Sequence, residues 1–158
     1  MNNENTQTAD GKAKFQEATI APMHTCEHIV NRTMVNMFGC GRSVSAHIER
    51  KKSKLDYRLP QALTEEEIKR VEDTVNEVIS RHLPVTAEYI PIEEAAKRVD
   101  LSRLPDGASD TVRVVKVGDY DDCLCIGQHV ENTSEIGTFK IISYDYADGI
   151  FRMRFKLL

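Results

Sequence analysis

The spacing of hydrophobic residues predicts two principal helices in the first half of the chain. Over 23–38, apolar side chains recur every three or four residues, and Gly39 is a suitable C-terminal stop. A second helix begins after Thr64, which can form a capping box with Glu67, and it ends before Pro84. Its expected buried stripe consists of Ile68, Val71, Val75, Val78 and Ile79.

Alternation of apolar and polar residues predicts strands on both sides of the second helix. Residues 44–48 and 55–59 alternate and can pair through the turn at 49–53. After a short helix near Pro91 and a loop over 101–110, four more strands are expected, at 112–117, 123–126, 138–144 and 150–157. This order predicts an α+β fold, a single domain in which a mainly antiparallel sheet packs with two main helices. We expect residues 1–19 to form a flexible N-terminal tail and residues 20–158 to form the domain.

Composition narrows the class of protein. A chain of 158 residues suffices for one hydrophobic core, and its net charge of −4 excludes a surface built wholly for nucleic acid. No stretch approaches the roughly 20 apolar residues that a membrane span requires, and the N-terminus lacks the apolar core of a secretory signal. We therefore expect a cytoplasmic protein. In that compartment the four cysteines are expected to be thiols or metal ligands rather than disulfides.

Two short motifs point to a metal site. His24 and His28 form an HxxxH pattern, which on a helix places two imidazoles one turn apart on one face. Cys125 and His129 form a CxxxH pattern near the end of an expected strand. Both patterns together arise by chance in about one chain in fifty. Three imidazoles and a thiolate suit zinc rather than magnesium or calcium.

Cys123 is the alternative to Cys125 as the sulfur ligand. Both side chains would point to the same face of a strand, about two strand steps apart, so one ion should not reach both. The CxxxH spacing favours Cys125. Cys26 and Cys40 have no matching partner motif and are interpreted as packing residues.

A series of motifs runs in order along most of the chain. It consists of HTCEH at 24–28, KLDY at 54–57, a helix with Ile68, Glu72, Asn76 and Ile79, VRVV at 112–115 and CIGQHVENTSEIGTF at 125–139. The series resembles the second additional domain of alanyl- and threonyl-tRNA synthetases. It resembles most of all the AlaX proteins, which are free-standing forms of that domain. The resemblance implies the α+β fold of this editing domain.

The same resemblance implies a function. Members of the family hydrolyse the ester between a wrong amino acid and the 3′ end of its tRNA, and they use zinc. The partner here would be the acceptor end of aminoacyl-tRNA, and the expected substrate is seryl- or glycyl-tRNA specific for alanine. No membrane or DNA partner is expected. Carried over to this chain, the zinc ligands would be His24, His28, Cys125 and His129. The candidate substrate contacts are Thr25, Gln128 and Asp56, and the catalytic group is left open between a zinc-bound water and Glu27.

Two other hypotheses stay open. Ile126 and Gln128 stand where the family usually has a small residue and a threonine. This departure is compatible with a zinc-binding domain that binds aminoacyl-tRNA or a synthetase and does no chemistry. The helix pattern HTxEH with one later cysteine also resembles S-ribosylhomocysteine lyase, in which Glu27 would be the base. The segment CIGQHVENTSEIG has no place in that family, so the lyase ranks below the hydrolase.

One segment is locally basic. From Gly41 to Pro60 there are six basic and two acidic side chains, a local charge of +4 that includes Arg42 and Arg58. A solvated hairpin tip is one explanation, and contact with tRNA phosphates is the other. The candidates for phosphate contact are Arg50, Lys51, Lys52 and Lys54.

Overall fold

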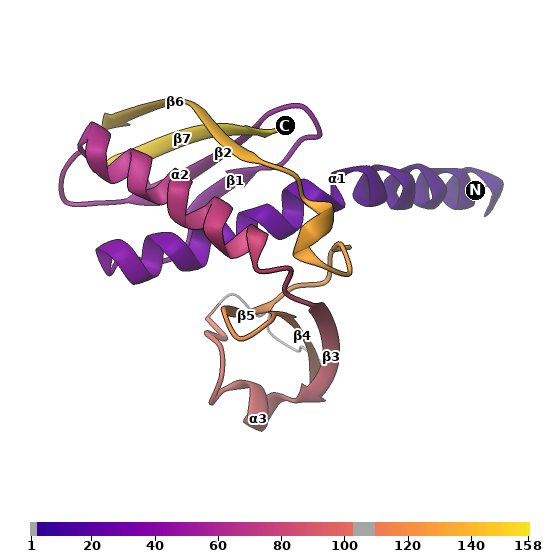
Figure 1. Ribbon diagram of the computed structural model, residues 1–158. Helices are drawn as coiled ribbons and strands as arrows, with labels where there is room; N and C mark the ends of the chain where they lie inside the picture. Colours follow the sequence, from indigo (N-terminus) through magenta and orange to yellow (C-terminus); the bar gives the residue numbers. More distant parts are fainter. Residues whose placement is uncertain (1–2, 103–109) are drawn as a thin grey trace.

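The predicted fold class is confirmed by a computed structural model, which describes residues 3–102 and 110–158. In chain order the elements are α1 (Asn3–Phe38), β1 (Ser45–His47), β2 (Ser53–Arg58), α2 (Glu65–Ser80), β3 (Val85–Pro91), α3 (Ile92–Ala95), β4 (Thr111–Val117), β5 (Asp121–Leu124), the short helix η1 (Thr133–Glu135), β6 (Phe139–Ala147) and β7 (Ile150–Leu157). They form one α+β domain with two antiparallel sheets. The larger sheet has the order β1-β2-β7-β6, and the smaller has the order β3-β4-β5 (Figure 1).

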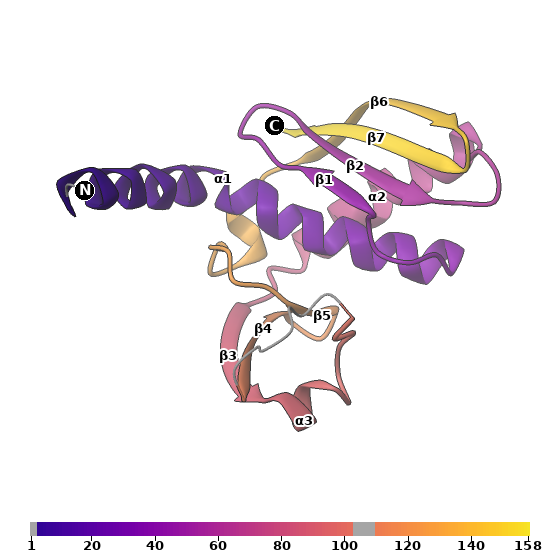
Figure 2. The same cartoon turned by 180° about the vertical axis from the view of Figure 1, so that it is seen from behind.

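The main hydrophobic core lies between the larger sheet and the helices α1 and α2. Alternate residues of β2 and β7 point into it and are buried, namely Leu55, Tyr57, Phe151, Met153 and Phe155. The buried faces of α1 and α2 close the same core. Figures 1 and 2 show α1 and α2 on one side of the larger sheet. By strand alternation, the intervening residues of β2 and β7 belong to the opposite face.

Helix α2 forms as predicted. The Thr64 hydroxyl accepts a hydrogen bond from Glu67 N at 3.1 Å, and the Glu67 carboxylate accepts one from Thr64 N at 2.9 Å. All five residues of the expected stripe are buried. The polar side of α2 meets the edge strand β6, where Asn76 bonds both backbone groups of Phe139. Glu72 likewise accepts the N–H of Ile141, so the helix satisfies backbone groups at the sheet edge.

Helix α1 ends where expected but begins earlier. Gly39 adopts a left-handed φ of 65°, and its N–H donates to the carbonyl of Val35 at 2.9 Å. The helix begins at Asn3 instead of Met23, and Pro22 lies inside it. Apolar spacing marks only the turns that pack on the core, so it does not locate a start beyond them. This helical backbone overlaps the segment 1–19, whose flexibility stays a prediction.

The smaller sheet includes β3, which the sequence pattern did not predict. Val85, Ala87 and Tyr89 alternate with the polar Thr86 and Glu88, but this alternation does not mark a buried face, because Ile90 is the one buried residue of the strand. Ile90 packs with Val112 and Val114 of β4 and with Ala95 of α3 in a small second core. Most of the predicted loop over 101–110 lies outside the described residues.

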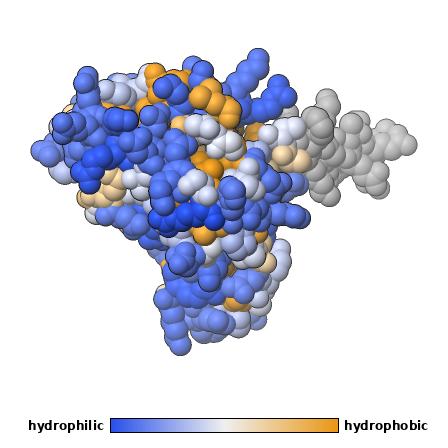
Figure 3. Space-filling model, in the orientation of Figure 1, coloured by the Kyte–Doolittle hydropathy of each residue, from blue (hydrophilic) through white to orange (hydrophobic). Residues whose placement is uncertain are grey.

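The surface seen in Figure 3 is largely hydrophilic, with hydrophobic residues in small patches. Two large hydrophobic side chains stand out by exposure, Ile126 at 92% and Tyr89 at 74%. Among the helices that the structure describes, none is long and apolar enough to cross a membrane.

Candidate metal centre

His24, His28, Cys125 and His129 form one cluster, in which one possible ligand atom from each residue lies within 4.8 Å of the others. The ring centroids of the two α1 histidines are 5.3 Å apart, as expected for neighbours one turn apart. Cys125 and His129 belong to the loop between β5 and η1. The structure thus brings together the four residues predicted as zinc ligands.

An arginine from β4 holds the loop that carries Cys125. Arg113 Nη1 donates to the carbonyl oxygen of Cys125 at 2.9 Å and to that of Gly127 at 2.8 Å. Gly127 lies directly against His24, because a Cβ at this position would stand 2.7 Å from His24 Nδ1. A side chain there would displace the histidine, so glycine is required for close approach.

Hydrogen bonds behind the cluster determine which nitrogen of His129 faces inward. The Thr25 hydroxyl donates its only proton to Ala21 O at 3.0 Å and accepts the N–H of Val130 at 3.2 Å. Its 3.0 Å contact with His129 Nδ1 therefore uses a proton on Nδ1. Burial lowers the pKa of His129 and favours the neutral ring. His129 Nε2 then presents a lone pair toward Cys125 Sγ, 3.4 Å away.

His24 has the same arrangement. Its Nδ1 lies 3.2 Å from the backbone oxygen of Gln128, which can only accept, so Nδ1 carries the proton of the neutral ring. Its Nε2 lies 3.4 Å from Cys125 Sγ. Two imidazole nitrogens and one sulfur therefore converge with their lone pairs, an arrangement that a cation between them stabilises.

His28 is oriented by a buried carboxylate. Its Nδ1 lies 3.5 Å from Asp121 Oδ2, which is too long for a well-formed hydrogen bond. Among the described residues this nitrogen has no other hydrogen-bond partner. Asp121 also accepts from Arg32 Nε at 3.0 Å and from Arg42 Nη1 at 2.8 Å. Burial alone would lower the pKa of His28, but Asp121 and Cys125 raise it to about 9. The surroundings therefore favour positive charge at this side of the cluster.

The two candidate sulfur ligands differ in charge. Burial alone would raise the pKa of Cys125, but the three imidazoles of His129, His24 and His28 around the sulfur lower it to about 3, which favours the thiolate. Burial raises the pKa of Cys123 to about 11, and that sulfur stays a thiol. The cluster contains Cys125 and not Cys123. A thiolate among three imidazoles is a donor set that fits zinc.

Three of the other predicted site residues adjoin the cluster. Thr25 is fully buried, and its hydroxyl is used inside the protein. Glu27 is half-buried, with Oε2 3.8 Å from His24 Nε2, and Gln128 is exposed. Their contacts with substrate stay predictions, and the surroundings of Thr25 favour a role in positioning His129.

Asp56 and the basic residues are not members of the cluster. Asp56 is on the outer face of β2 and accepts two hydrogen bonds from Arg152, at 2.8 and 3.0 Å. Arg42 is turned inward against Asp121, so the basic segment has one fewer cation for phosphates than its sequence indicates. The predicted phosphate contacts Arg50, Lys51 and Lys52 are exposed at the turn between β1 and β2, and Lys54 is half-buried in β2.

Sequence reasoning missed Asp121 and Arg113. Asp121 belongs to an Asp-Asp pair typical of an exposed turn, and Arg113 is one of two charged residues in an otherwise largely apolar strand. One signal could have found Asp121, because it lies two and four residues before Cys123 and Cys125. The alternation of a strand places all three on one face, which here is the face toward the cluster.

The residues that follow His129 serve a structural purpose. Asn132 and Glu135 form a capping box around η1. The Thr133 hydroxyl accepts the N–H of Leu83 at 2.9 Å and donates to the carbonyl of Ile79 at 2.9 Å. Residues 132–135 therefore join the end of α2 to the loop that carries Cys125 and His129, which we call the metal loop.

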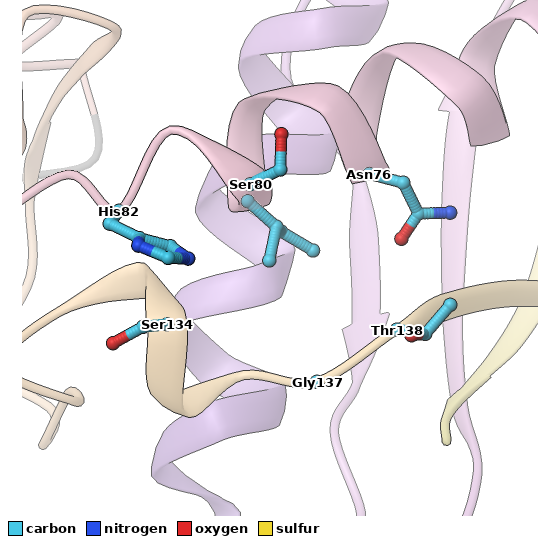
Figure 4. Close-up of a pocket in the computed structure, with 7 residues that line it drawn as sticks. Asn76, Ser80, His82, Ser134, Gly137 and Thr138 are labelled. Atoms are coloured by element: carbon cyan, nitrogen blue, oxygen red, sulfur yellow. The ribbon is translucent and has the colours of Figure 1, made fainter.

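A surface pocket of about 400 Å³ lies at the same junction. Figure 4 shows Asn76 and Ser80 from α2 on one wall, with Ser134, Gly137 and Thr138 opposite them. The lining contains no member of the metal cluster, so this pocket is separate from the candidate metal centre.

A family comparison covers the loop of the cluster. Residues 112–154 match the model of the family described as the Threonyl and Alanyl tRNA synthetase second additional domain. The matched range contains Cys125 and His129 together with Arg113 and Asp121, which hold or orient the cluster.

Most of the chain is also similar to alanine–tRNA ligases. The ligase of Fervidobacterium nodosum is 40% identical over 121 residues, 76% of this chain and 14% of the ligase. The ligase of Treponema denticola is 36% identical over 132 residues, 83% of this chain and 22% of the ligase. The chain thus spans only 14% to 22% of the length of these relatives. These findings confirm the resemblance predicted from the sequence, and the chain is related to alanine–tRNA ligases in a part that includes the second additional domain.

Proposed function

We propose that the chain is a zinc-dependent hydrolase that removes a wrong amino acid from tRNA in the cytoplasm, acting in trans on seryl- or glycyl-tRNA specific for alanine. The relationship to alanine–tRNA ligases supports a role in tRNA editing or tRNA binding. The observation that carries the hydrolase proposal is the cluster of three imidazoles and a thiolate, in which two outer nitrogens donate to protein oxygens and the third faces Asp121.

In this proposal His24, His28, Cys125 and His129 hold the zinc. A zinc ion bound there would supply the Lewis acidity that ester hydrolysis requires. Thr25 and Gln128 O keep His129 and His24 in the tautomer that leaves Nε2 as a donor to the ion. Asp121 orients His28 from the third side.

The remaining roles belong to residues at the margin of the cluster. The Glu27 carboxylate, beside His24, is the candidate proton acceptor for an attacking water. Ile126 is almost fully exposed in the loop, where its side chain can meet the substrate, and Gln128 is its exposed neighbour. The turn with Arg50, Lys51 and Lys52 supplies charge for tRNA phosphates.

A binding-only domain is the second candidate, and one observation favours it. All four ligand side chains converge, and four protein ligands can fill a tetrahedral zinc site and close it to substrate. The two candidates differ in a single measurable property, the rate of ester hydrolysis with zinc fully loaded.

The test combines metal analysis with single-turnover deacylation. We expect about one zinc per chain after purification without added zinc, and hydrolysis of mischarged seryl- or glycyl-tRNA with correctly charged alanyl-tRNA spared. Full zinc with no deacylation of any aminoacyl-tRNA would support the binding-only domain. Conversion of S-ribosylhomocysteine by the same preparation would support the lyase instead.

A further inference from the structure

The outer face of the larger sheet has a distinct distribution of charge. Strand alternation puts Lys54, Asp56 and Arg58 of β2 on this face, opposite the buried Leu55 and Tyr57. The same alternation in β7 puts Arg152, Arg154 and Lys156 there, opposite the buried Phe151, Met153 and Phe155.

The register between strands arranges these residues in rows across the sheet. Lys140 of β6 faces Lys156, and Lys54 faces Arg154, which pairs in turn with Ser143. The following row, Asp56–Arg152–Asp145, carries one positive charge against two negative charges. Positive charge therefore gathers at the end of the sheet that holds the turn between β1 and β2.

We name this end the basic strip and define it as Lys54, Lys140, Arg154 and Lys156 together with Arg50, Lys51 and Lys52 of the turn. Its acidic neighbours are Glu49 in the turn and Asp145, which pairs with Arg154 at 3.1 Å. The strip and these two acids carry a net charge of +5, whereas the whole chain carries −4. The rest of the chain is therefore strongly acidic, and the strip is a localised site for an anion.

Three lysines of the strip are available to bind an anion. Within the part of the chain that the structure describes, no carboxylate lies within 4.0 Å of the ammonium groups of Lys54, Lys140 and Lys156. Three cations held side by side on a rigid sheet repel one another, and a polyanion that neutralises them releases its counterions.

The strip is also at the end of the sheet that continues into the metal loop. The chain runs from His129 through η1 to Phe139 at the start of β6, directly before Lys140. Thr138 and Leu158 exchange two backbone hydrogen bonds, of 3.1 and 2.8 Å, which fix the last strand at this end. Figure 2 shows the C-terminus beside the turn between β1 and β2. An extended polyanion on the strip can thus continue toward the metal centre.

We propose that the basic strip on the outer face of the larger sheet binds the phosphate backbone of tRNA. That the polyanion is tRNA rests on the proposed function. That the ligand is a polyanion follows from the positive charge of the strip and from the rows of cations across neighbouring strands. The strip acts by charge on the backbone, so binding is insensitive to the RNA sequence and sensitive to salt.

The experiment compares two charge reversals of equal size. Lys140→Glu with Lys156→Glu reverses two cations of the strip. The control, Arg58→Glu with Arg70→Glu, reverses one exposed cation at the far end of the same face and one on α2. Binding of uncharged alanine-specific tRNA is titrated at several salt concentrations. We expect the strip variant to bind more weakly and the slope of log K against log salt to fall in magnitude by about 2, with little change in the control.

Hydrolysis separates this inference from the proposed function. The strip variant is expected to keep its zinc and to hydrolyse a minimal aminoacyl ester at the wild-type rate. If the strip variant binds tRNA more weakly than the wild type and the wild type deacylates no aminoacyl-tRNA, the inference about the strip is supported and the hydrolase is rejected. Equal slopes for wild type, strip variant and control would overturn the strip, as would binding to phosphatidylserine vesicles with none to tRNA.

Discussion

The segment from Cys125 to Phe139 has two adjoining halves with different roles. The first half carries Cys125 and His129, and the second carries Asn132, Thr133 and Glu135. In the first half, Cys125 Sγ lies 3.4 Å from Nε2 of His24 on α1, and His129 Nε2 lies 3.4 Å from the same sulfur. In the second half, Asn132, Thr133 and Glu135 bond to backbone groups of nearby turns. One continuous motif therefore combines two candidate metal ligands with the contacts that anchor them, so we expect changes in the two halves to have different effects.

The largest expected effect is the loss of the sulfur ligand in the first half. Cys125→Ser should lower zinc content from about one per chain to near zero, because the hydroxyl is a far weaker zinc ligand than a thiolate. Deacylation should be lost with the metal. Metal analysis of the purified variant is the measurement. Cys123→Ser is the matched control and should keep its zinc, and the reverse pattern would assign the site to Cys123.

A smaller effect is expected at Thr25 of α1, which contacts His129 and Val130 of the segment. Thr25→Val keeps the shape of the side chain but removes the acceptor for His129 Nδ1 and Val130 N. Loss of such support typically costs 10- to 100-fold in metal affinity, so we expect zinc to bind weaker by about that factor. Competition with a chromophoric chelator measures it. Thr25→Ser is the control, and unchanged affinity in the valine variant would reject the positioning role.

The second half should affect stability and leave metal stoichiometry intact. Thr133→Val removes a buried hydroxyl that bonds Leu83 N and Ile79 O. Leaving the N–H of Leu83 without its partner should cost about 1–3 kcal/mol. Tm should fall by about 2–4 °C for each kcal/mol in a chain of this size. Calorimetry and metal analysis are run on the same sample, and zinc lost from the folded variant would contradict the division between the halves.

The smallest expected effect lies outside the segment, at Asp56. Its hydrogen bonds from Arg152 hold the pKa of the Asp56 carboxyl below its usual range. The pair therefore adds stability above the unfolded pKa of about 4, and this contribution disappears as pH falls through the depressed folded value. Asp56→Asn should be slightly less stable than wild type at pH 7 and should converge with it in acid. Urea melts from pH 7 to pH 3 measure the difference, and altered deacylation of a minimal ester would instead support its predicted contact with substrate.

The sequence predicted the parts of the fold whose burial is periodic. Helix α2 has a cap and a five-residue stripe, and both are present in the structure. Strand β3 was not predicted, although Val85, Ala87 and Tyr89 alternate with polar residues. Most of its side chains are exposed at a sheet edge, so the alternation does not coincide with burial. The start of α1 was not predicted, because helical turns that do not pack on the core need no apolar spacing.

For the site, spacing identified the four clustered residues but not their supports. HxxxH and CxxxH are local patterns, because a helical turn or a short loop can bring two residues four positions apart close together. Asp121 acts on His28 across 93 positions of the chain, and Arg113 acts through backbone carbonyls that any residue would supply. Apart from the strand alternation that places Asp121 on the same face as Cys123 and Cys125, contacts of this kind leave no signature in residue spacing.

The separation between the two ligand pairs has a consequence for folding. His28 and Cys125 lie 97 positions apart, and the elements from β1 to β5 are enclosed between them. A zinc ion bound as proposed would act as a cross-link that closes this loop, and closing a loop of about 100 residues removes unfolded-state entropy worth up to about 4.7 kcal/mol. Chelation should then loosen the attachment of α1 to the small sheet before it disturbs the larger one, and amide exchange would report that order.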